Sequence, residues 1–208
     1  MEGKNAVIFA SGPVSDYNYI VDSIPQDPYI ICADGGVEHC KKCGFTPDVI
    51  IGDMDSYEGS VDESKLIKYP AEKDDTDTSL CIKYAIEKGY ENIEIFGAVG
   101  GRIDHTIANL QLLLFANKNG VNCTLKDSAE TVFLLQNETK NLSVKEGTIV
   151  SLFAVSVKAE DITLKGLKYP LKKANLYNDF PLGISNVAVE NEIEIAVGNG
   201  MLLVVISH

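Results

Sequence analysis

The sequence has little positive charge and no long hydrophobic segment. Its 208 residues include 18 Lys and Arg against 30 Asp and Glu, a formal net charge of -12. Binding of DNA or RNA depends on neutralising phosphates with Lys and Arg, so nucleic acids are poor candidate partners. No run approaches the roughly 18 to 20 apolar residues that span a bilayer, and the first residues lack a signal-peptide cleavage pattern. We expect a cytoplasmic protein that binds neither nucleic acid nor membrane.

Residue types used in covalent and redox catalysis are also scarce. The chain has no Trp, 3 His and 5 Cys. An odd number of cysteines without a second pair at metal-ligand spacing favours neither a disulfide framework nor a structural zinc site. Cys40 and Cys43 share a helical face with Val37, which favours buried small apolar side chains over a redox pair. No Ser or Cys nucleophile has a recognisable partner, and neither a P-loop nor a dinucleotide-binding glycine motif is present.

The first part of the chain alternates strand-like and helix-like segments. Short β-rich runs occupy residues 6–10, 29–32, 49–51 and 93–96, and two amphipathic helices are expected at 76–88 and 104–117. Strands that alternate with helices predict an α/β domain with a mostly parallel, Rossmann-like sheet covered on both faces.

The pattern changes after about residue 128. Short strand-like runs follow one another with turn signals between them and no convincing helix; they lie at 148–157, 162–164, 187–189, 192–197 and 201–206. This arrangement predicts a small antiparallel β-sandwich or barrel. We therefore expect an α/β domain at 1–128, followed by a β-sandwich domain at 129–208.

Acidic residues gather where the expected strands of the first domain end. Asp34 follows the second run, Asp53 and Asp55 follow the third, Asp77 opens a helix, and Asp104 precedes another. In open α/β sheets the carboxyl ends of the strands form the ligand crevice, so these carboxylates are expected to converge there. Carboxylates that lie close together repel each other unless a cation compensates them, and hard oxygen ligands select Mg²⁺, usually together with substrate phosphates. A site for a metal ion and a phosphate follows.

Each of these residues taken alone has a purely structural interpretation. Asp53 and Asp55 are also consistent with a solvated turn, and Thr76 or Asp104 with an ordinary helix N-cap. Arg102 follows two glycines just before a helix N-terminus, where an anion is already favoured, so it is suited to hold a phosphate bidentately; the alternative is a surface arginine.

Taken together, the motifs resemble the ordered motifs of the thiamine pyrophosphokinase family, over essentially the whole chain. They are Ala33-Asp34-Gly35-Gly36, the 51–56 segment Ile-Gly-Asp-Met-Asp-Ser, Asp74-Asp75-Thr76-Asp77, the 100–105 segment Gly-Gly-Arg-Ile-Asp-His with Asn109, Gly183-Ile184-Ser185-Asn186, and Gly200-Met201-Leu202-Leu203-Val204.

The resemblance implies a transferase that moves the pyrophosphoryl group of ATP onto the hydroxyl of thiamine, giving thiamine diphosphate and AMP. It implies an ATP-binding α/β catalytic domain, a thiamine-binding β-sandwich domain, and a homodimer with thiamine bound where the subunits meet. It also implies Mg²⁺ as cofactor and ATP as co-substrate.

The family roles transfer to matching positions of this chain. Asp53, Asp55 and Asp77 match the acidic residues that handle Mg²⁺ and the ATP phosphates. From the chemistry of the transfer, Arg102 is expected to stabilise the charge that develops. The nucleotide and phosphate site is matched by Asp34, Thr76, Arg102, Asp104 and Asn109, and the thiamine-facing loop by Ser185 and Asn186. Asp77 and Asp55 are the candidates for the base that accepts the thiamine hydroxyl proton.

The chain departs from the family pattern at few positions. Some members carry a Trp that stacks on thiamine; this chain has none, so any stacking comes from another side chain. Met54 stands where many relatives have Phe. Three alternatives stay open: a pyrophosphokinase for another alcohol, a non-catalytic nucleotide sensor on the same fold, and an interaction module whose carboxylates are only solvated turns.

Overall fold

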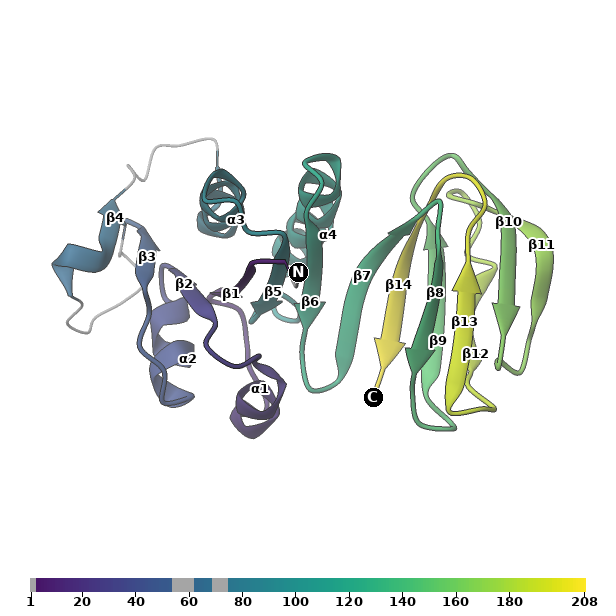
Figure 1. Ribbon diagram of the computed structural model, residues 1–208, viewed down its shortest axis with the longest axis horizontal. Coiled ribbons are helices and arrows are strands. Elements are labelled where there is room, and N and C mark those ends of the chain that lie inside the picture. Colours follow the sequence, from purple (N-terminus) through teal and green to yellow (C-terminus); the bar gives the residue numbers. More distant parts are fainter. Residues whose placement is uncertain (1–2, 54–61, 69–74) are drawn as a thin grey trace. The chain divides into compact units, whose positions relative to one another are not determined.

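The computed structural model describes residues 3–53, 62–68 and 75–208. The chain divides into two compact units, Met1–Ser128 and Ala129–His208. In the first unit, strands alternate with helices along the chain (Figure 1): β1 (Asn5–Phe9), α1 (Tyr17–Ser23), β2 (Tyr29–Ala33), α2 (Gly36–Lys42), β3 (Val49–Gly52), the short 3-10 helix η1 (Glu63–Lys65), β4 (Leu66–Lys68), α3 (Asp77–Glu87), β5 (Asn92–Phe96), α4 (Ile103–Lys118) and β6 (Asn122–Lys126).

The strands of the first unit form a parallel sheet. Their spatial order is β6-β5-β1-β2-β3-β4, and every pairing recorded between them is parallel. Figure 1 shows α1 and α2 on one face of this sheet and α3 and α4 on the other. Because all strands point the same way, the loops after β1, β2, β3 and β5 reach the same edge of the sheet, as ligand-binding open α/β sheets require.

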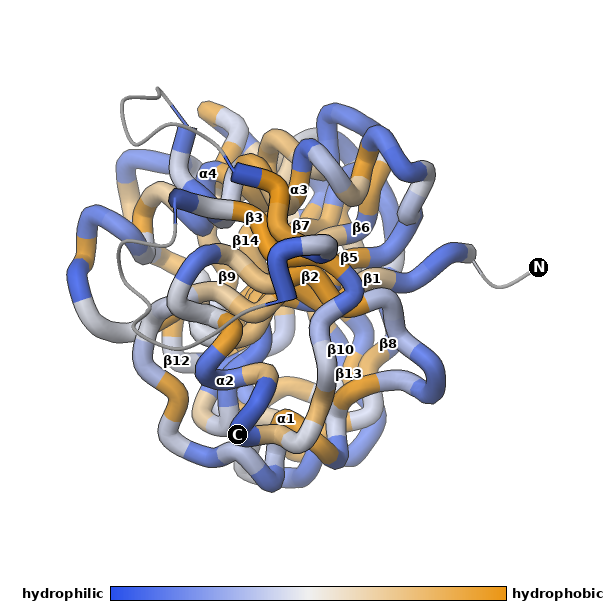
Figure 2. Tube along the Cα trace, turned by 90° about the vertical axis from the view of Figure 1, so that its left-hand side faces the viewer, coloured by the Kyte–Doolittle hydropathy of each residue, from blue (hydrophilic) through white to orange (hydrophobic). Residues whose placement is uncertain are grey.

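Coverage on both faces explains why these strands are almost wholly apolar. Val7 and Phe9 of β1 pack in a cluster with Val37 and Cys40 of α2, whereas Ile8, between them on the strand, points to the other face and is also fully buried. Figure 2 shows the same pattern as hydrophobic colouring on β1, β2, β3 and β5. Continuous apolar runs, rather than alternating ones, are the mark of strands buried on both faces.

Cys40 and Cys43, which were expected on one face of a helix, both contact the hydrophobic core of the first unit. Cys40 is buried in the α2 cluster, and the half-buried Cys43 packs against it. Burial raises the pKa of the Cys43 thiol to about 11, which disfavours the reactive thiolate. The interpretation of these residues as small apolar packing groups is confirmed.

The second unit contains antiparallel strands arranged in two sheets. One has the order β12-β9-β14-β7 and the other β11-β10-β13-β8. The strands are β7 (Glu130–Gln136), β8 (Thr139–Ser143), β9 (Ile149–Ala154), β10 (Lys158–Lys165), β11 (Leu171–Tyr177), β12 (Gly183–Val187), β13 (Glu192–Ala196) and β14 (Met201–Ser207).

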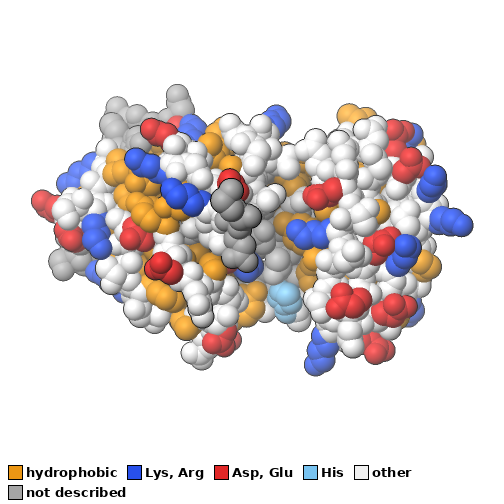
Figure 3. All heavy atoms as spheres, viewed as in Figure 1, with side chains coloured by type: hydrophobic (Ala, Val, Ile, Leu, Met, Phe, Trp, Pro, Cys, Tyr) orange, Lys and Arg blue, Asp and Glu red, His pale blue; other side chains and the backbone are white. Residues whose placement is uncertain are grey.

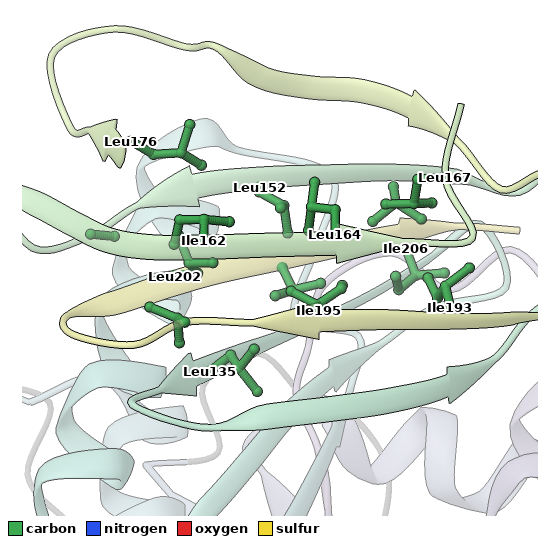
Figure 4. Packing of buried hydrophobic residues seen from close by; sticks show 14 of the residues in the cluster. Leu135, Leu152, Ile162, Leu164, Leu167, Leu176, Ile193, Ile195, Leu202 and Ile206 are labelled. Atoms are coloured by element: carbon green, nitrogen blue, oxygen red, sulfur yellow. The ribbon is translucent and has the colours of Figure 1, made fainter. Parts of the chain in front are cut away.

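The two sheets of the second unit share one hydrophobic core. Leu152 and Leu202 come from one sheet and Ile162 and Ile195 from the other, and Figure 4 shows these side chains between the sheets. Alternate residues of the same strands face outward, where the surface drawn in Figure 3 intersperses acidic and basic side chains over this unit. This arrangement is a β-sandwich.

Two expectations about the fold need correction. The strands are mostly parallel only in the first unit; over the whole chain they are mixed, because each pairing recorded in the second unit is antiparallel. The strand expected at 187–189 is instead β12, Gly183–Val187. Its polar residues Ser185 and Asn186 hide it from a hydrophobicity pattern, and its pairing with β9 is irregular between Gly183 and Asn186.

Candidate active site

A pocket of about 330 Å³ opens at the carboxyl edge of the parallel sheet. It is lined by the 10–13 loop after β1, by residues 97–98 and 100–101 after β5, by Thr78, and by Arg102, His105 and Asn109 at the start of α4. Free N–H groups and the positive end of the helix dipole make the N-terminus of a 16-residue helix such as α4 attractive to anions. The pocket is therefore suited to a phosphorylated ligand.

The backbone of two loops forms much of this pocket. Ala10 N–H donates to the Phe96 carbonyl at 2.8 Å, and Gly12 N–H donates to the Gly97 carbonyl at 2.9 Å. A Cβ on Gly12 would lie 2.4 Å from the Gly97 oxygen, so no larger residue fits there without movement. The glycines keep side chains off the pocket surface and let a ligand approach the main chain.

His39 of α2 holds the first of these loops in place. Its Nε2 lies 2.9 Å from the Gly12 carbonyl oxygen, and its Nδ1 lies 2.9 Å from the Tyr17 hydroxyl. The neutral ring satisfies both contacts when Nε2–H donates to Gly12 and Nδ1 accepts from Tyr17. Burial, together with the nearby charge of Lys42, lowers the pKa of His39 and favours that neutral form.

Asn109 and Arg102 reach the pocket from α4 by different means. Asn109 is buried, and its Nδ2 donates to the Ala98 carbonyl at 2.7 Å, which fixes the second loop. Arg102 is exposed and forms a two-point ion pair with Asp104, with Nε–Oδ1 at 3.1 Å and Nη2–Oδ2 at 2.5 Å. The pairing raises the pKa of Arg102 and lowers the pKa of Asp104. The guanidinium thus already binds an oxyanion in the fork geometry that suits a phosphate.

The N-cap interpretation holds for Thr76 and is wrong for Asp104. Thr76 caps α3, accepting from Ser79 N–H through its hydroxyl at 3.2 Å. The N-cap of α4 is instead Arg102, without a side-chain cap bond, and Asp104 lies in the first turn, where a carboxylate is favoured by the helix dipole.

Asp34 is the most unusual of the carboxylates. It is 4% exposed, has φ of +44°, and its Oδ1 is buried with no hydrogen-bond partner among the described residues. The next strand runs close beside it, since a Cβ on Gly52 would lie 3.0 Å from the Asp34 Cβ. An unsatisfied buried carboxylate oxygen is costly, which suggests that a cation or a donor from a ligand normally completes it.

The other acidic residues fall on the same edge or outside the described residues. Asp53 directly follows β3, the neighbour of β2, and is partly buried. Asp77 is the first residue of α3, and Asp75, two residues before it, forms an ion pair with Lys83 at 2.6 Å. Asp55, like Met54 and Asp74, lies outside the described residues.

The residues present fit a divalent cation by donor type. Asp34, Asp53 and Asp77 offer carboxylate oxygens at the carboxyl ends of β2 and β3 and at the start of α3, and such oxygens are what Mg²⁺ prefers. Within the described part of the chain, no three acidic, His or Cys side chains already form a metal-ligand cluster. The buried Oδ1 of Asp34, which has no hydrogen-bond partner among the described residues, is the observation that favours a bound cation.

In the second unit, Ser185 and Asn186 have different surroundings. Ser185 is exposed with φ of +56°, and its N–H donates to the Ser151 hydroxyl at 3.0 Å. Asn186 is buried; its Oδ1 accepts from the N–H groups of Tyr169 and Val187, each at 2.9 Å, and its Nδ2 donates to the Tyr169 carbonyl at 2.8 Å. Asn186 therefore ties β12 to the segment at Tyr169, while Ser185 is displayed at the surface of the strand. The residues expected in a thiamine-facing loop thus lie in a strand.

Of the residues singled out from the sequence, Arg102 and Asn109 line the same pocket. The sequence reasoning missed the contribution of the 10–13 loop and of Thr78. It also missed His39, which holds the 10–13 loop through Gly12. The Ser11-Gly12-Pro13 turn directly after a strand was the available signal for the loop; His39 had none, because its partner Gly12 is far away in the sequence.

Among the helices that the structure describes, none is both long enough and apolar enough to cross a membrane.

Comparison with known proteins covers nearly the whole chain. Residues 21–125 match the family model described as thiamin pyrophosphokinase, catalytic domain, and residues 136–202 match the one described as thiamin pyrophosphokinase, vitamin B1 binding domain. The chain is 28% identical to a thiamine pyrophosphokinase of Bacillus subtilis over 211 residues, covering 97% of this chain and 98% of the relative.

Solved structures agree. The crystal structure of the Bacillus subtilis thiamine pyrophosphokinase superposes with a TM-score of 0.86 at 25% identity, covering 98% of this chain and 99% of that one. That of Geobacillus thermodenitrificans gives 0.82 at 26% identity, covering 98% and 97%. The fold is thus shared with these structures, and this chain belongs to the thiamin pyrophosphokinase family.

Proposed function

We propose that this chain transfers the pyrophosphoryl group of ATP to the hydroxyl of thiamine, giving thiamine diphosphate and AMP. The single observation that carries the proposal is the coincidence of the family match with the glycine-lined pocket at the N-terminus of α4, where Arg102 is already engaged by an oxyanion. Phosphoryl transfer needs mainly positioning and charge neutralisation, which this arrangement supplies.

In the proposed reaction the thiamine oxygen bonds to the β-phosphorus of ATP while the bond from that phosphorus to the oxygen shared with the α-phosphorus breaks. The proton of the thiamine hydroxyl goes to a carboxylate, for which Asp77 and Asp55 are our candidates. Arg102 binds the phosphate oxygens in place of the Asp104 carboxylate; because both side chains are exposed, separating them costs little. The 10–13 and 97–101 loops bind the nucleotide through their main chain.

We assign Mg²⁺ to Asp53, Asp55 and Asp77. Asp34, Thr76, Asp104 and Asn109 complete the nucleotide site, Asp34 by its unpartnered oxygen and Asn109 by fixing the Ala98 loop. When bound, Mg²⁺ would neutralise charge on the ATP phosphate oxygens. In this assignment the first unit, at 1–128, binds ATP, and the second, at 129–208, binds thiamine through Ser185 and Asn186 of β12.

We further propose that the protein is a homodimer with thiamine at the subunit interface. Ile149 of β9 is 43% exposed, and Leu203 and Val205 of β14 are half-buried on the same outward face. Apolar side chains grouped on the outer face of a sheet suit a self-complementary interface. Sedimentation equilibrium of the wild type should give the mass of a dimer, and Ile149→Lys should shift the equilibrium toward monomer. A monomeric wild type would overturn the proposed homodimer.

We place the protein in the cytoplasm. All five cysteines lie among the described residues, and the structure records them as thiols, the state that a reducing compartment maintains.

The activity is tested by AMP release from ATP and Mg²⁺, with and without thiamine. We expect thiamine-dependent AMP from the wild type and its loss in Asp55→Asn. Asp22→Asn, at an exposed position of α1, is the matched control and should retain wild-type rates. Tight ATP binding without AMP would favour the nucleotide sensor; AMP formed with a different alcohol would favour a related pyrophosphokinase. Unchanged function in Asp55→Asn would favour the interaction module.

A further inference from the structure

The second unit contains a small pocket with three aromatic side chains in its walls. Its volume is about 130 Å³, and Phe153, Tyr177, Phe180 and Asp179 line it. These aromatic side chains are 39%, 48% and 65% exposed, in the order Phe153, Tyr177, Phe180. Large aromatic side chains are usually mostly buried, so three that surround one exposed hollow indicate a recognition surface.

The fold holds this aromatic pocket in place. Phe153 belongs to β9, and Tyr177 is the last residue of β11. The turn that follows β11 is fixed by backbone bonds: Asn178 N–H donates to Val157 at 3.3 Å, Phe180 N–H to Tyr177 at 3.4 Å, and Leu182 N–H to Phe180 at 2.9 Å. The walls therefore come from two strands and a hydrogen-bonded turn.

The aromatic pocket adjoins β12, the strand that carries Ser185 and pairs with β9. Ser151 accepts from Ser185 N–H at 3.0 Å. Phe153 is two residues further along β9, so its side chain lies on the same face of the strand as Ser151, about 7 Å away. The pocket and Ser185 are thus displayed on one surface of the second unit.

The chemistry of the walls selects a cation. Aromatic ring faces attract organic cations, and the carboxylate of Asp179 adds an opposite charge. Among the described residues that line the pocket, none is Lys or Arg. The volume is well below the roughly 300 to 1,000 Å³ of pockets for drug-sized ligands, so it suits a single ring.

We propose that this aromatic pocket binds the ring of an organic cation and that, in the reaction proposed above, the ring is the thiazolium of thiamine. This identification of the ring rests on the proposed function; the cation selectivity of the pocket does not. Phe180, Tyr177 and Phe153 are then specificity-determining residues, and Ser185 lies beside the ring that they hold.

The test compares a cation with its neutral counterpart by titration calorimetry. The probes are 4-methyl-5-(2-hydroxyethyl)thiazole and the same compound methylated on the ring nitrogen, which differ chiefly in charge. The wild type should bind the methylated cation at least fivefold more tightly than the neutral thiazole. Phe180→Ala and Tyr177→Ala should each remove most of this preference, while Tyr177→Phe, which keeps the ring, should stay within about twofold of the wild type.

Val157→Ala is the matched control, because Val157 is an exposed apolar side chain of the same unit that does not line the pocket. In the enzymatic assay, Phe180→Ala should raise KM for thiamine with kcat unchanged, the sign of lost substrate binding alone. Melting curves of each variant identify any loss of folding; Phe180 is 65% exposed, so its truncation should leave Tm unchanged.

Equal binding of the two probes, or an unchanged preference in Phe180→Ala, would overturn the inference, and thiamine-dependent AMP release would still stand. Conversely, a wild type that releases no thiamine-dependent AMP but prefers the cation, with the preference lost in Phe180→Ala, would overturn the proposed function and support the pocket assignment.

Discussion

The two units of this chain build their sites in opposite ways. In the first, buried parallel strands end in glycine-rich loops, and the ligand pocket is largely main chain, as with Gly12 against Gly97. In the second, antiparallel strands enclose one core, and the candidate site consists of side chains displayed on an outer surface, such as Phe153 and Phe180. A parallel sheet concentrates its loops at one edge, whereas a sandwich leaves its sheet faces for recognition.

The largest expected effect comes from the shared core of the second unit. Leu202 is fully buried between the sheets, so Leu202→Ala should lower the free energy of unfolding by about 2 to 5 kcal/mol. ATP binding, which we assign to the first unit, should persist below the transition when measured by calorimetry. Leu203→Ala, its half-buried neighbour on the outward face, is the control and should cost less. If Leu202→Ala weakens ATP binding as much as it lowers the free energy of unfolding, the two units do not keep their sites independently.

The second largest effect is expected from Arg102→Ala. Removing a guanidinium that stabilises developing phosphate charge should lower kcat/KM about 100-fold, or ~2.7 kcal/mol. Stability should change little, because the pair with Asp104 is exposed. Steady-state AMP release and a melting curve measure the two effects. Lys165→Ala removes an exposed lysine that pairs with Glu194 in the second unit and should leave kcat/KM unchanged. A similar loss in both variants would contradict the assignment.

Gly12→Ala tests whether the backbone pocket depends on the absence of a side chain. The added methyl would lie 2.4 Å from the Gly97 oxygen, so the loop must move, and a displacement of this kind should weaken ATP binding roughly tenfold or more. Gly147→Ala is a control of a different kind: nothing lies within 4 Å of its Cβ, although its φ of +92° adds strain. It should lower stability without changing ATP affinity. If Gly12→Ala binds ATP as tightly as the wild type, the pocket does not require a residue without a side chain at this position.

The smallest effect concerns pH. The pKa of His39 is lowered in the folded protein, mainly by burial, so the unfolded chain binds the proton more readily. Stability should therefore decrease as pH falls below about 6.5, the unfolded pKa, and continue to fall until the folded pKa is reached. In His39→Gln, which cannot take up that proton, urea unfolding between pH 7 and 5 should show a shallower slope. An identical slope in both proteins would show that His39 is not the titrating group.

The elements that could be predicted were those whose local pattern agrees with their tertiary role. The strands β1, β2, β3 and β5 are apolar because both faces are covered, and α3 begins at a Thr cap. β12 was misplaced because it is polar and irregularly paired.

Site geometry was less predictable than site composition. The sequence indicated Arg102 and Asn109, but their partners are set by tertiary packing: Arg102 meets Asp104 in the first turn of α4, and Asn109 reaches back to Ala98. The contact from His39 to Gly12 joins residues on different elements. The sequence indicated Asp34 as well, but neither its φ of +44° nor the lack of a hydrogen-bond partner for its Oδ1 among the described residues can be read from a side-chain pattern.

The main-chain floor of the first pocket has a consequence for inhibition and resistance. A compound that fills this pocket and bonds to the main-chain carbonyl oxygens around Gly12 and Gly97 would address atoms that every amino acid carries. Point mutations cannot delete those atoms, and a larger residue at Gly12 would disturb the enzyme's own loop. Escape would therefore have to arise through the side chains that line the pocket, such as those of Thr78 and His105.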